Sequence, residues 1–177
     1  TFFPVGEAVS TAAGIEHGPM VAKPTPDSVV IAWRSVATVA PSVEWGPTPA
    51  YGSLATGPAG TVHEIALTGL SPATPYHYRV LLDGSPAGGG HAFKTPPVDP
   101  AAAVRFAVAA DTGSGCAAQM RVIDRIEEMN PDFVLLAGDL AYMGGTPVEV
   151  RTRMMWPFAE LLATRPVFAA LGNHDVV

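Results

Sequence analysis

Three short polar clusters follow three apolar runs in the second half of the chain. The clusters are Asp111-Thr112-Gly113, Gly138-Asp139-Leu140-Ala141-Tyr142 and Gly172-Asn173-His174-Asp175. The runs before them cover residues 104–110, 133–137 and 166–171. Because parallel strands bring their carboxyl ends to one edge of a sheet, where α/β proteins bind ligands, we expect the clusters to meet in one crevice. Two carboxylates, a phenol, an amide oxygen and an imidazole form an oxygen-rich set that suits hard metal ions.

Each of these residues also has an ordinary structural interpretation. Asp111 could cap the helix that follows it, and Asp139 could shape a turn. Tyr142 alone would more often be a half-buried packing residue. Asn173 is a common turn former, and a lone histidine such as His174 is more often structural. The functional interpretation therefore depends on the three clusters occurring in this order at successive strand ends.

The elements that must carry the clusters have the pattern of a βαβ unit. Continuous apolar runs are typical of parallel strands that are covered on both faces. Helical spacing predicts a helix over residues 117–129, which ends at Asn130-Pro131. A second helical stretch is expected from about residue 148 to 162, interrupted at Pro157.

The first half of the chain has a different pattern, with short runs rich in β-branched and aromatic residues between Gly, Pro and Thr clusters. Predicted strands cover residues 28–34, 42–45, 62–67, 76–82 and 91–94. Val29, Ile31 and Trp33 alternate with their neighbours, as on the core face of a sheet. The spacing predicts an all-β sandwich. A Pro- and Ala-rich stretch around residues 97–103 favours an extended linker.

Composition excludes several classes of protein. The 177 residues are 48% apolar and 15% charged, which is enough to bury a core. A net charge of −6 without a basic cluster argues against nucleic acid or an anionic membrane as the main partner. Cys116 is the single cysteine, so no internal disulfide is possible, and we interpret it as a small buried residue. No apolar stretch approaches the length of a membrane span. Since the sequence begins at Thr1 without a leader pattern, we expect either a removed signal peptide or a fragment.

The motifs resemble those of known families. Leu70-Ser71-Pro72-Ala73-Thr74-Pro75-Tyr76 is similar to the fibronectin type III corner, in which a Tyr bonds back to the preceding turn. Asp-x-Gly, Gly-Asp-x-x-Tyr and Gly-Asn-His-Asp resemble the first three of five motifs of the purple acid phosphatases, within the calcineurin-like metallophosphoesterases. Many members carry a fibronectin-like N-terminal domain, and the Tyr at position 142 points to this subfamily.

The resemblance implies a fold class and a domain organisation. The expected fold is an all-β sandwich, fibronectin III-like, followed by the first half of an α/β metallophosphoesterase domain of the αββα type. Residues 1–17 remain unassigned, and residues 18–96 form the sandwich domain. A linker over residues 97–103 then leads to residues 104–177, the N-terminal half of the catalytic domain.

The resemblance also implies a binuclear metal centre, with Fe³⁺ and a divalent ion (Fe, Zn or Mn). Asp111 would bind the first metal, Asp139 would bridge both, and Tyr142 would bind the first as a phenolate. Asn173 would bind the second metal. His174 would not be a ligand but a substrate-binding residue or general acid. The implied reaction is two-metal hydrolysis of small phosphate esters, with metal-bound hydroxide as the nucleophile.

Part of the family pattern is missing, because the last two motifs, which bring three further His ligands, do not occur before Val177. The chain as given is therefore expected to be inactive alone. The remaining histidines precede the linker and are interpreted as sandwich or surface residues; they are His17, His63, His77 and His91. Two alternatives stay open: a phosphodiesterase or nucleotide-cleaving relative, and a non-enzymatic fibronectin-type binding protein with a relic catalytic domain. The resemblance implies a secreted, periplasmic or extracellular location and leaves the oligomeric state unknown.

Overall fold

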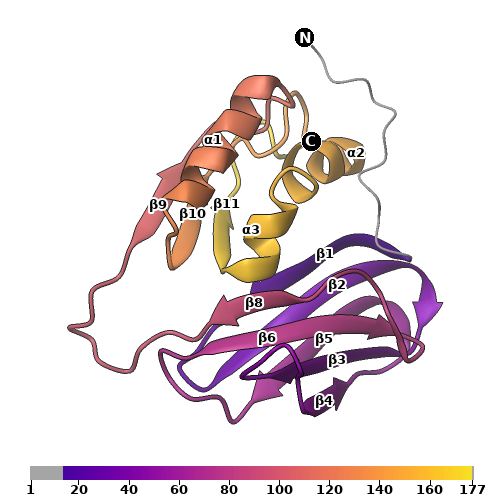
Figure 1. Ribbon diagram of the computed structural model, residues 1–177. Coiled ribbons are helices and arrows are strands. Elements are labelled where there is room, and N and C mark those ends of the chain that lie inside the picture. The colour runs from indigo at the N-terminus through magenta and orange to yellow at the C-terminus, as the bar shows by residue number, and fades with distance from the viewer. Residues whose placement is uncertain (1–13, 177) are drawn as a thin grey trace. The chain divides into compact units, whose positions relative to one another are not determined.

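The computed structural model describes residues 14–176, which divide into two compact units (Figure 1). The main boundary lies between Ala103 and Val104, and the short stretch Leu162–Pro166 is grouped with the first unit. The first unit consists of strands β1 (Ile15–Ala22), β2 (Ser28–Val39), β3 (Pro41–Gly46), β4 (Ser53–Thr56), β5 (Gly60–Thr68), β6 (Pro75–Leu82), β7 (Ser85–Pro86) and β8 (His91–Lys94). They form two antiparallel sheets, β1-β2-β5 and β4-β3-β6-β7, and β8 also pairs with β6. This is the predicted sandwich.

The sandwich core follows from the alternation of buried and exposed residues along β2 and β5. On β2, Val29, Ile31 and Trp33 are at most 2% exposed, while the residues between them face outward or are half-buried. Their register partners on β5 continue the same face, with Ile31 opposite Ile65. Because a shift of one residue would turn this apolar set toward solvent, the alternation also determines the register.

The predicted fibronectin-type corner is confirmed. The backbone N–H of Ser71 donates to the Tyr76 hydroxyl at 2.9 Å, and Tyr76 is 7% exposed. Thr95 strengthens the same corner, because its Oγ1 donates to the Ser71 carbonyl at 2.7 Å and accepts from the Thr74 N–H at 2.9 Å. A buried aromatic residue and a buried hydroxyl therefore hold the turn before β6.

Strand β1 was not predicted, and it places the start of the sandwich at Ile15 rather than at residue 18. Its pairing with β2 shifts register between Ile15 and His17 and again between His17 and Met20. These irregularities, at Gly18 and its neighbours, remove the period-two alternation by which a strand is recognised. Strand β4 was also missed, because it is short and mostly exposed.

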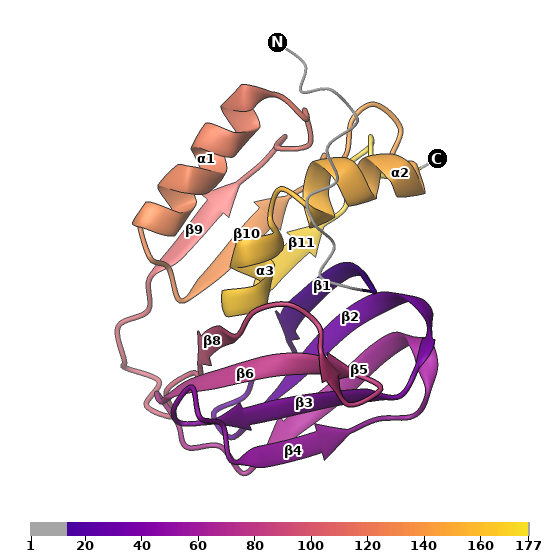
Figure 2. The same ribbon diagram turned by 45° about the vertical axis from the view of Figure 1, so that its right-hand side comes forward.

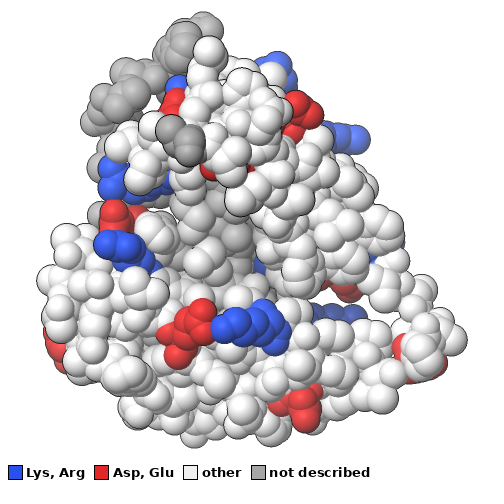
Figure 3. All heavy atoms as spheres, turned by 180° about the vertical axis from the view of Figure 1, so that it is seen from behind, with Lys and Arg blue, Asp and Glu red and all other residues white. Residues whose placement is uncertain are grey.

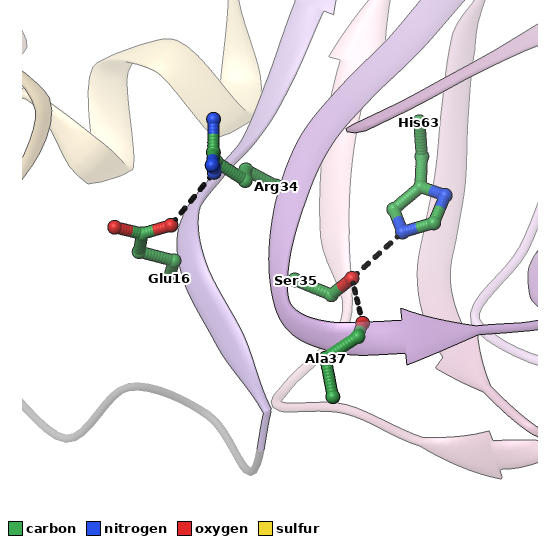
Figure 4. Close-up of polar contacts among 5 residues, drawn as sticks. All are labelled: Glu16, Arg34, Ser35, Ala37 and His63. Carbon is green, nitrogen blue, oxygen red and sulfur yellow. Dashed lines mark hydrogen bonds and ion pairs between the residues drawn. The ribbon is translucent and has the colours of Figure 1, made fainter. Parts of the chain in front are cut away.

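The sandwich buries one histidine completely. His63 is 2% exposed, and its Nε2 lies 2.9 Å from the hydroxyl of Ser35 (Figure 4). Since Ser35 uses its single proton to donate to the Ala37 carbonyl at 2.7 Å, the His63 Nε2–H is the donor toward Ser35. The Nδ1 atom is then a buried acceptor without a hydrogen-bond partner. Burial lowers the pKa of His63 below 6.5.

The second unit is built as the predicted βαβ pattern. Its elements are β9 (Phe106–Ala109), α1 (Ala117–Glu128), β10 (Phe133–Ala137), α2 (Pro147–Glu149), the π-helix η1 (Val150–Met155), α3 (Ala159–Thr164) and β11 (Val167–Ala170). The strands form a parallel sheet in the order β11-β10-β9. The second predicted helical stretch is therefore three short consecutive pieces. No helix among residues 14–176 has the length and apolarity of a membrane span.

Helix α1 corrects one prediction. Cys116 is its N-cap residue and is exposed, not a buried filler. Its Sγ lies 3.1 Å from the Ser114 hydroxyl, and this hydrogen bond is the main cause that lowers the pKa of the thiol to about 7. The apolar face of α1, with Ile123 and Ile126 buried, accounts for the helical spacing in the sequence.

The parallel sheet is covered on one face only, which corrects the expectation of two covered faces. Helix α1 runs along one side of β9 and β10, where Val134 and Leu136 are at most 1% exposed (Figures 1 and 2). On the other face Phe106, Val108 and Phe168 remain 48–60% exposed. The view from behind in Figure 3 shows broad areas without charged side chains. The apolar runs are those of a doubly covered sheet, but residues 14–176 supply helices to one face alone.

Candidate functional site

The three polar clusters lie together at the carboxyl edge of the parallel sheet. Ala109 and Ala170, the last residues of β9 and β11, pair with neighbouring residues at the end of β10. Backbone hydrogen bonds then join the first two clusters: the Asp111 N–H donates to the Gly138 carbonyl and the Gly113 N–H to the Asp139 carbonyl, both at 3.1 Å. The strands thus bring together residues far apart in the sequence.

Both aspartates have a left-handed backbone, with φ of 57° at Asp111 and 52° at Asp139. This conformation is uncommon outside glycine, although Asp tolerates it better than most residues, and it is enriched at functional sites. Asp111 does not cap α1, whose N-cap is Cys116. The simplest structural interpretation of Asp111 is therefore wrong.

Two glycines make the close approach of the loops possible. A Cβ at Gly113 would lie 2.3 Å from the carbonyl of Leu140, and one at Gly172 would lie 2.1 Å from Oδ1 of Asp139. Neither position has room for a side chain unless the backbone moves. The spacing of Gly in the motifs therefore has a steric reason: the loops pack against each other through bare backbone.

Tyr142 connects the two carboxylates. Its hydroxyl lies 2.8 Å from Oδ1 of Asp111 and 2.9 Å from Oδ2 of Asp139. Bonding to Asp111, burial and bonding to Asp139 all raise the pKa of the phenol. The pKa of Asp139 is lowered, chiefly by the backbone N–H of His174, which donates to its Oδ1 at 3.1 Å. Three of the four predicted metal ligands therefore meet directly.

His174 and Asn173 occupy the third loop beside this group. The His174 ring lies 4.7 Å from the Tyr142 ring between centroids. Its Nδ1 lies 2.8 Å from the Met143 carbonyl, which can only accept, so Nδ1 carries a proton and Nε2 is left for exchange. Asn173 is exposed and is joined to the group through its neighbour His174.

Asp175 holds the second and third loops together, a role that the sequence did not reveal. Its Oδ1 accepts from the N–H groups of Leu140 and Ala141 at 2.7 and 3.0 Å, and its Oδ2 accepts from the Gly172 N–H at 2.8 Å. One carboxylate thus joins the loop of Asp139 to the loop of His174. Its place at the end of Gly-Asn-His-Asp was the only available signal.

Gln119 and Arg153 hold the loop that follows Asp111. Arg153 Nη1 donates to the Ser114 carbonyl at 3.0 Å, and the Gly115 N–H donates to Oε1 of Gln119 at 2.8 Å. Gln119 also donates through Nε2 to the Arg153 carbonyl and is 4% exposed. Arg153 lies on the π-helix η1, a rare geometry that often occurs at functional sites. No motif in the sequence distinguishes this pair.

The donor set fits the oxygen ligands of a hard-metal centre. The Tyr142 hydroxyl lies within hydrogen-bond distance of both carboxylates, and hard ions prefer such oxygen donors. Among residues 14–176 there is no group of three or more His, Cys, Asp or Glu side chains placed to hold a metal. The described residues thus fit the oxygen-donor part of such a centre and supply no cluster of imidazole ligands.

Comparison with known proteins agrees with this arrangement. Residues 104–176 match the family described as calcineurin-like phosphoesterase. Purple acid phosphatase 15 of Arabidopsis thaliana is 28% identical over a match of 149 residues, and the match covers 67% of this chain and 27% of that protein. The structure of purple acid phosphatase PPD1 from yellow lupin (Lupinus luteus) seeds gives a TM-score of 0.73 at 22% identity, covering 88% of this chain and 35% of that one. The structure of PhoD gives a TM-score of 0.64 at 16% identity, covering 97% of this chain and 40% of that chain.

Residues 104–176 thus match the calcineurin-like phosphoesterase family, and the chain is similar in sequence to a purple acid phosphatase. The structural likenesses, at these low identities, show the fold, and the predicted fold class is confirmed. The chain spans 27% of the length of the curated relative it matches.

Proposed function

We propose that this chain supplies the first half of the active site of a metal-dependent phosphate-ester hydrolase of the purple acid phosphatase type. The observation that supports this most is the convergence of Asp111, Asp139 and Tyr142, two of them with a left-handed backbone, at the carboxyl edge of a parallel sheet. The family match over residues 104–176 supports phosphoester hydrolysis as the general chemistry.

Within this proposal the ligands have separate roles. Asp111 and Tyr142 would hold Fe³⁺, Asn173 would hold a divalent ion (Fe, Zn or Mn), and Asp139 would bridge both. When bound, such a pair of ions activates water and neutralises charge on the phosphoryl oxygens. Tyr142 donates a hydrogen bond to a carboxylate in the described structure, so it must lose its proton to become a ligand.

His174 would act on the leaving group. With Nδ1–H held by the Met143 carbonyl, the imidazolium presents its second proton at Nε2. As the bond between phosphorus and the ester oxygen breaks, the leaving alkoxide takes the Nε2 proton, and His174 becomes neutral. The bond from the His174 N–H to Asp139 keeps this group beside the carboxylates.

The domain organisation belongs to the same proposal. Residues 15–96 form the fibronectin III-like domain, residues 97–103 the linker, and residues 104–177 the first half of the catalytic domain. The substrate would be a small phosphate ester, not nucleic acid, and the location would be secreted or periplasmic. Because residues 1–177 do not contain the last two motifs of the family pattern, which bring three further His ligands, we expect this stretch alone to show no efficient hydrolysis.

The test uses the protein at the length of its relatives. Metal content and hydrolysis of a chromogenic phosphate monoester and diester are measured for the unaltered protein and for Asp139→Ala. Asp124→Ala is the matched control, since Asp124 is an exposed carboxylate on α1. We expect Asp139→Ala to lose metal and activity together and Asp124→Ala to keep both. An active Asp139→Ala variant would refute the proposal, and the ratio of monoester to diester hydrolysis would separate a phosphatase from a phosphodiesterase.

A further inference from the structure

Glu149 makes a hydrogen bond that its local role does not require. It is the third helical residue of a capping box at the start of α2: its backbone N–H donates to Thr146 Oγ1 at 3.3 Å, and its Oε2 accepts from the Thr146 N–H at 3.1 Å. These bonds complete the cap. Its other oxygen, Oε1, accepts from the N–H of Met143 at 2.7 Å, outside the box.

Met143 is held by its backbone and not by packing. The residue is 77% exposed, so apolar packing contributes little to its position. Gly144 and Gly145 follow it, and neither has a side chain that could pack and fix this part of the loop. The two polar groups of Met143 therefore matter: its N–H donates to Glu149, and its carbonyl accepts from Nδ1 of His174.

A continuous path of hydrogen bonds thus runs from Glu149 through the backbone of Met143 to the imidazole of His174. The Met143 carbonyl selects which nitrogen of the ring carries the proton, since a carbonyl can only accept. If the Met143 backbone moves, the ring loses both its orientation and its preferred tautomer. Thr146 takes no part in this path beyond its bonds to Glu149.

We propose that Glu149 is a positioning residue for His174, which acts by fixing the Met143 carbonyl that holds the imidazole as its Nδ1–H tautomer. The catalytic consequence rests on the proposed function, in which His174 donates its Nε2 proton to the leaving group. The structural part, the control of the tautomer, does not depend on metal or on turnover.

The structural part is tested by NMR on residues 1–177. The ¹⁵N shifts of the neutral His174 ring report which nitrogen is protonated, and His174→Ala assigns the signals among the five histidines. We expect the Nδ1–H tautomer in the unaltered chain and a shift toward the Nε2–H form in Glu149→Ala. Glu149→Gln keeps an oxygen that can accept from Met143 and should restore the original spectrum.

Thr146→Ala is the matched control, because it removes the cap and leaves the bond between Glu149 and Met143 in place. It should lower helix stability without changing the tautomer of His174. If Glu149→Ala does not fold, Glu149→Asp replaces it, since the shorter side chain cannot reach Thr146 and Met143 together. An Nδ1–H tautomer that persists in the Ala or Asp variant overturns the proposal, as does an Nε2–H tautomer in the unaltered chain.

The catalytic consequence is measured on the full-length, metal-loaded protein. We expect Glu149→Ala to lower kcat by about 10- to 10²-fold with KM nearly unchanged, as for a misplaced catalytic group. Thr146→Ala should stay close to the unaltered protein. If His174→Ala keeps full activity while the tautomer still responds to Glu149, the proposed function fails and the positioning role stands. If His174→Ala is inactive and Glu149→Ala changes neither tautomer nor kcat, the positioning role fails alone.

Discussion

The sandwich and the α/β unit bury their apolar residues to different extents. In the sandwich the largest residues are closed inside, with Trp33 1% and Tyr78 0% exposed. In the α/β unit, Phe106 and Phe168 lie on an open face of the sheet and are 51% and 48% exposed. The candidate site residues lie in the α/β unit, whose sheet is less completely covered, and hydrogen bonds to the backbone of the loops hold them in place. Apolar packing therefore accounts for the stability of the first unit, and polar contacts between loops account for the geometry of the site in the second.

The largest expected effect separates the histidines of the two units. In the full-length protein, His174→Ala should lower turnover by roughly 10²- to 10⁴-fold, the usual range for a lost proton donor, with metal content unchanged. His77→Ala, on strand β6 of the sandwich, should leave turnover unchanged. Steady-state kinetics and metal analysis measure both. Loss of a metal in His174→Ala would mean that this residue is a ligand and that its proposed role is wrong.

A pair of truncations tests the difference in burial directly. Trp33→Ala should lower the free energy of unfolding of the sandwich by about 3–5 kcal/mol, because it removes a fully buried ring. Phe106→Ala should cost less than about 1 kcal/mol, since half of its surface is already exposed. Urea unfolding followed by circular dichroism gives both values. Equal costs would show that Phe106 is buried in solution and that the open face is covered.

Tyr76→Phe examines the corner of the sandwich. The substitution removes the acceptor for the Ser71 N–H and should destabilise residues 14–96 by about 1 kcal/mol. Tyr51→Phe is the comparison, since Tyr51 is half-buried at the surface, with Arg79 over its ring. Chemical denaturation of the isolated sandwich measures the effect. An unchanged midpoint in Tyr76→Phe would show that the corner bond adds no net stability.

The smallest expected effect is a pH dependence confined to the sandwich. Because burial lowers the pKa of His63, the folded state prefers the neutral ring, and the unfolded chain takes up a proton first as pH falls below 6.5. The stability contributed by the neutral ring is fully present above pH 6.5 and declines as pH falls toward the lowered pKa. This decline should appear in unfolding curves of the sandwich measured between about pH 7.5 and pH 5, the range in which His side chains ordinarily titrate. A His63→Phe variant should remove it, and an identical slope in that variant would assign the decline to another group.

Much of this molecule is predictable because its signals are local. The alternation of Val29, Ile31 and Trp33 predicts the core face of β2, and the Tyr76 corner is encoded within a few residues. Strand β1 escaped prediction because its bulges break the alternation. The exposure of Cys116 and the open face of the sheet were not predicted either, since the burial of a residue depends on which other parts of the chain pack against it.

The same distinction applies to the candidate site. The residue types and their positions after apolar strands predict that Asp111, Asp139, Tyr142 and His174 come together, because parallel strands align their ends. Asp175 is marked only by its place at the end of Gly-Asn-His-Asp, and nothing in the pattern distinguishes Glu149 or Arg153. All three bond to backbone groups of other loops. Any exposed backbone N–H can donate to a carboxylate, and any exposed carbonyl can accept from a guanidinium, so the choice of partner carries no sequence motif. The sequence by itself determined which groups meet at the edge of the sheet, and only the tertiary structure decided which side chains hold their loops in place.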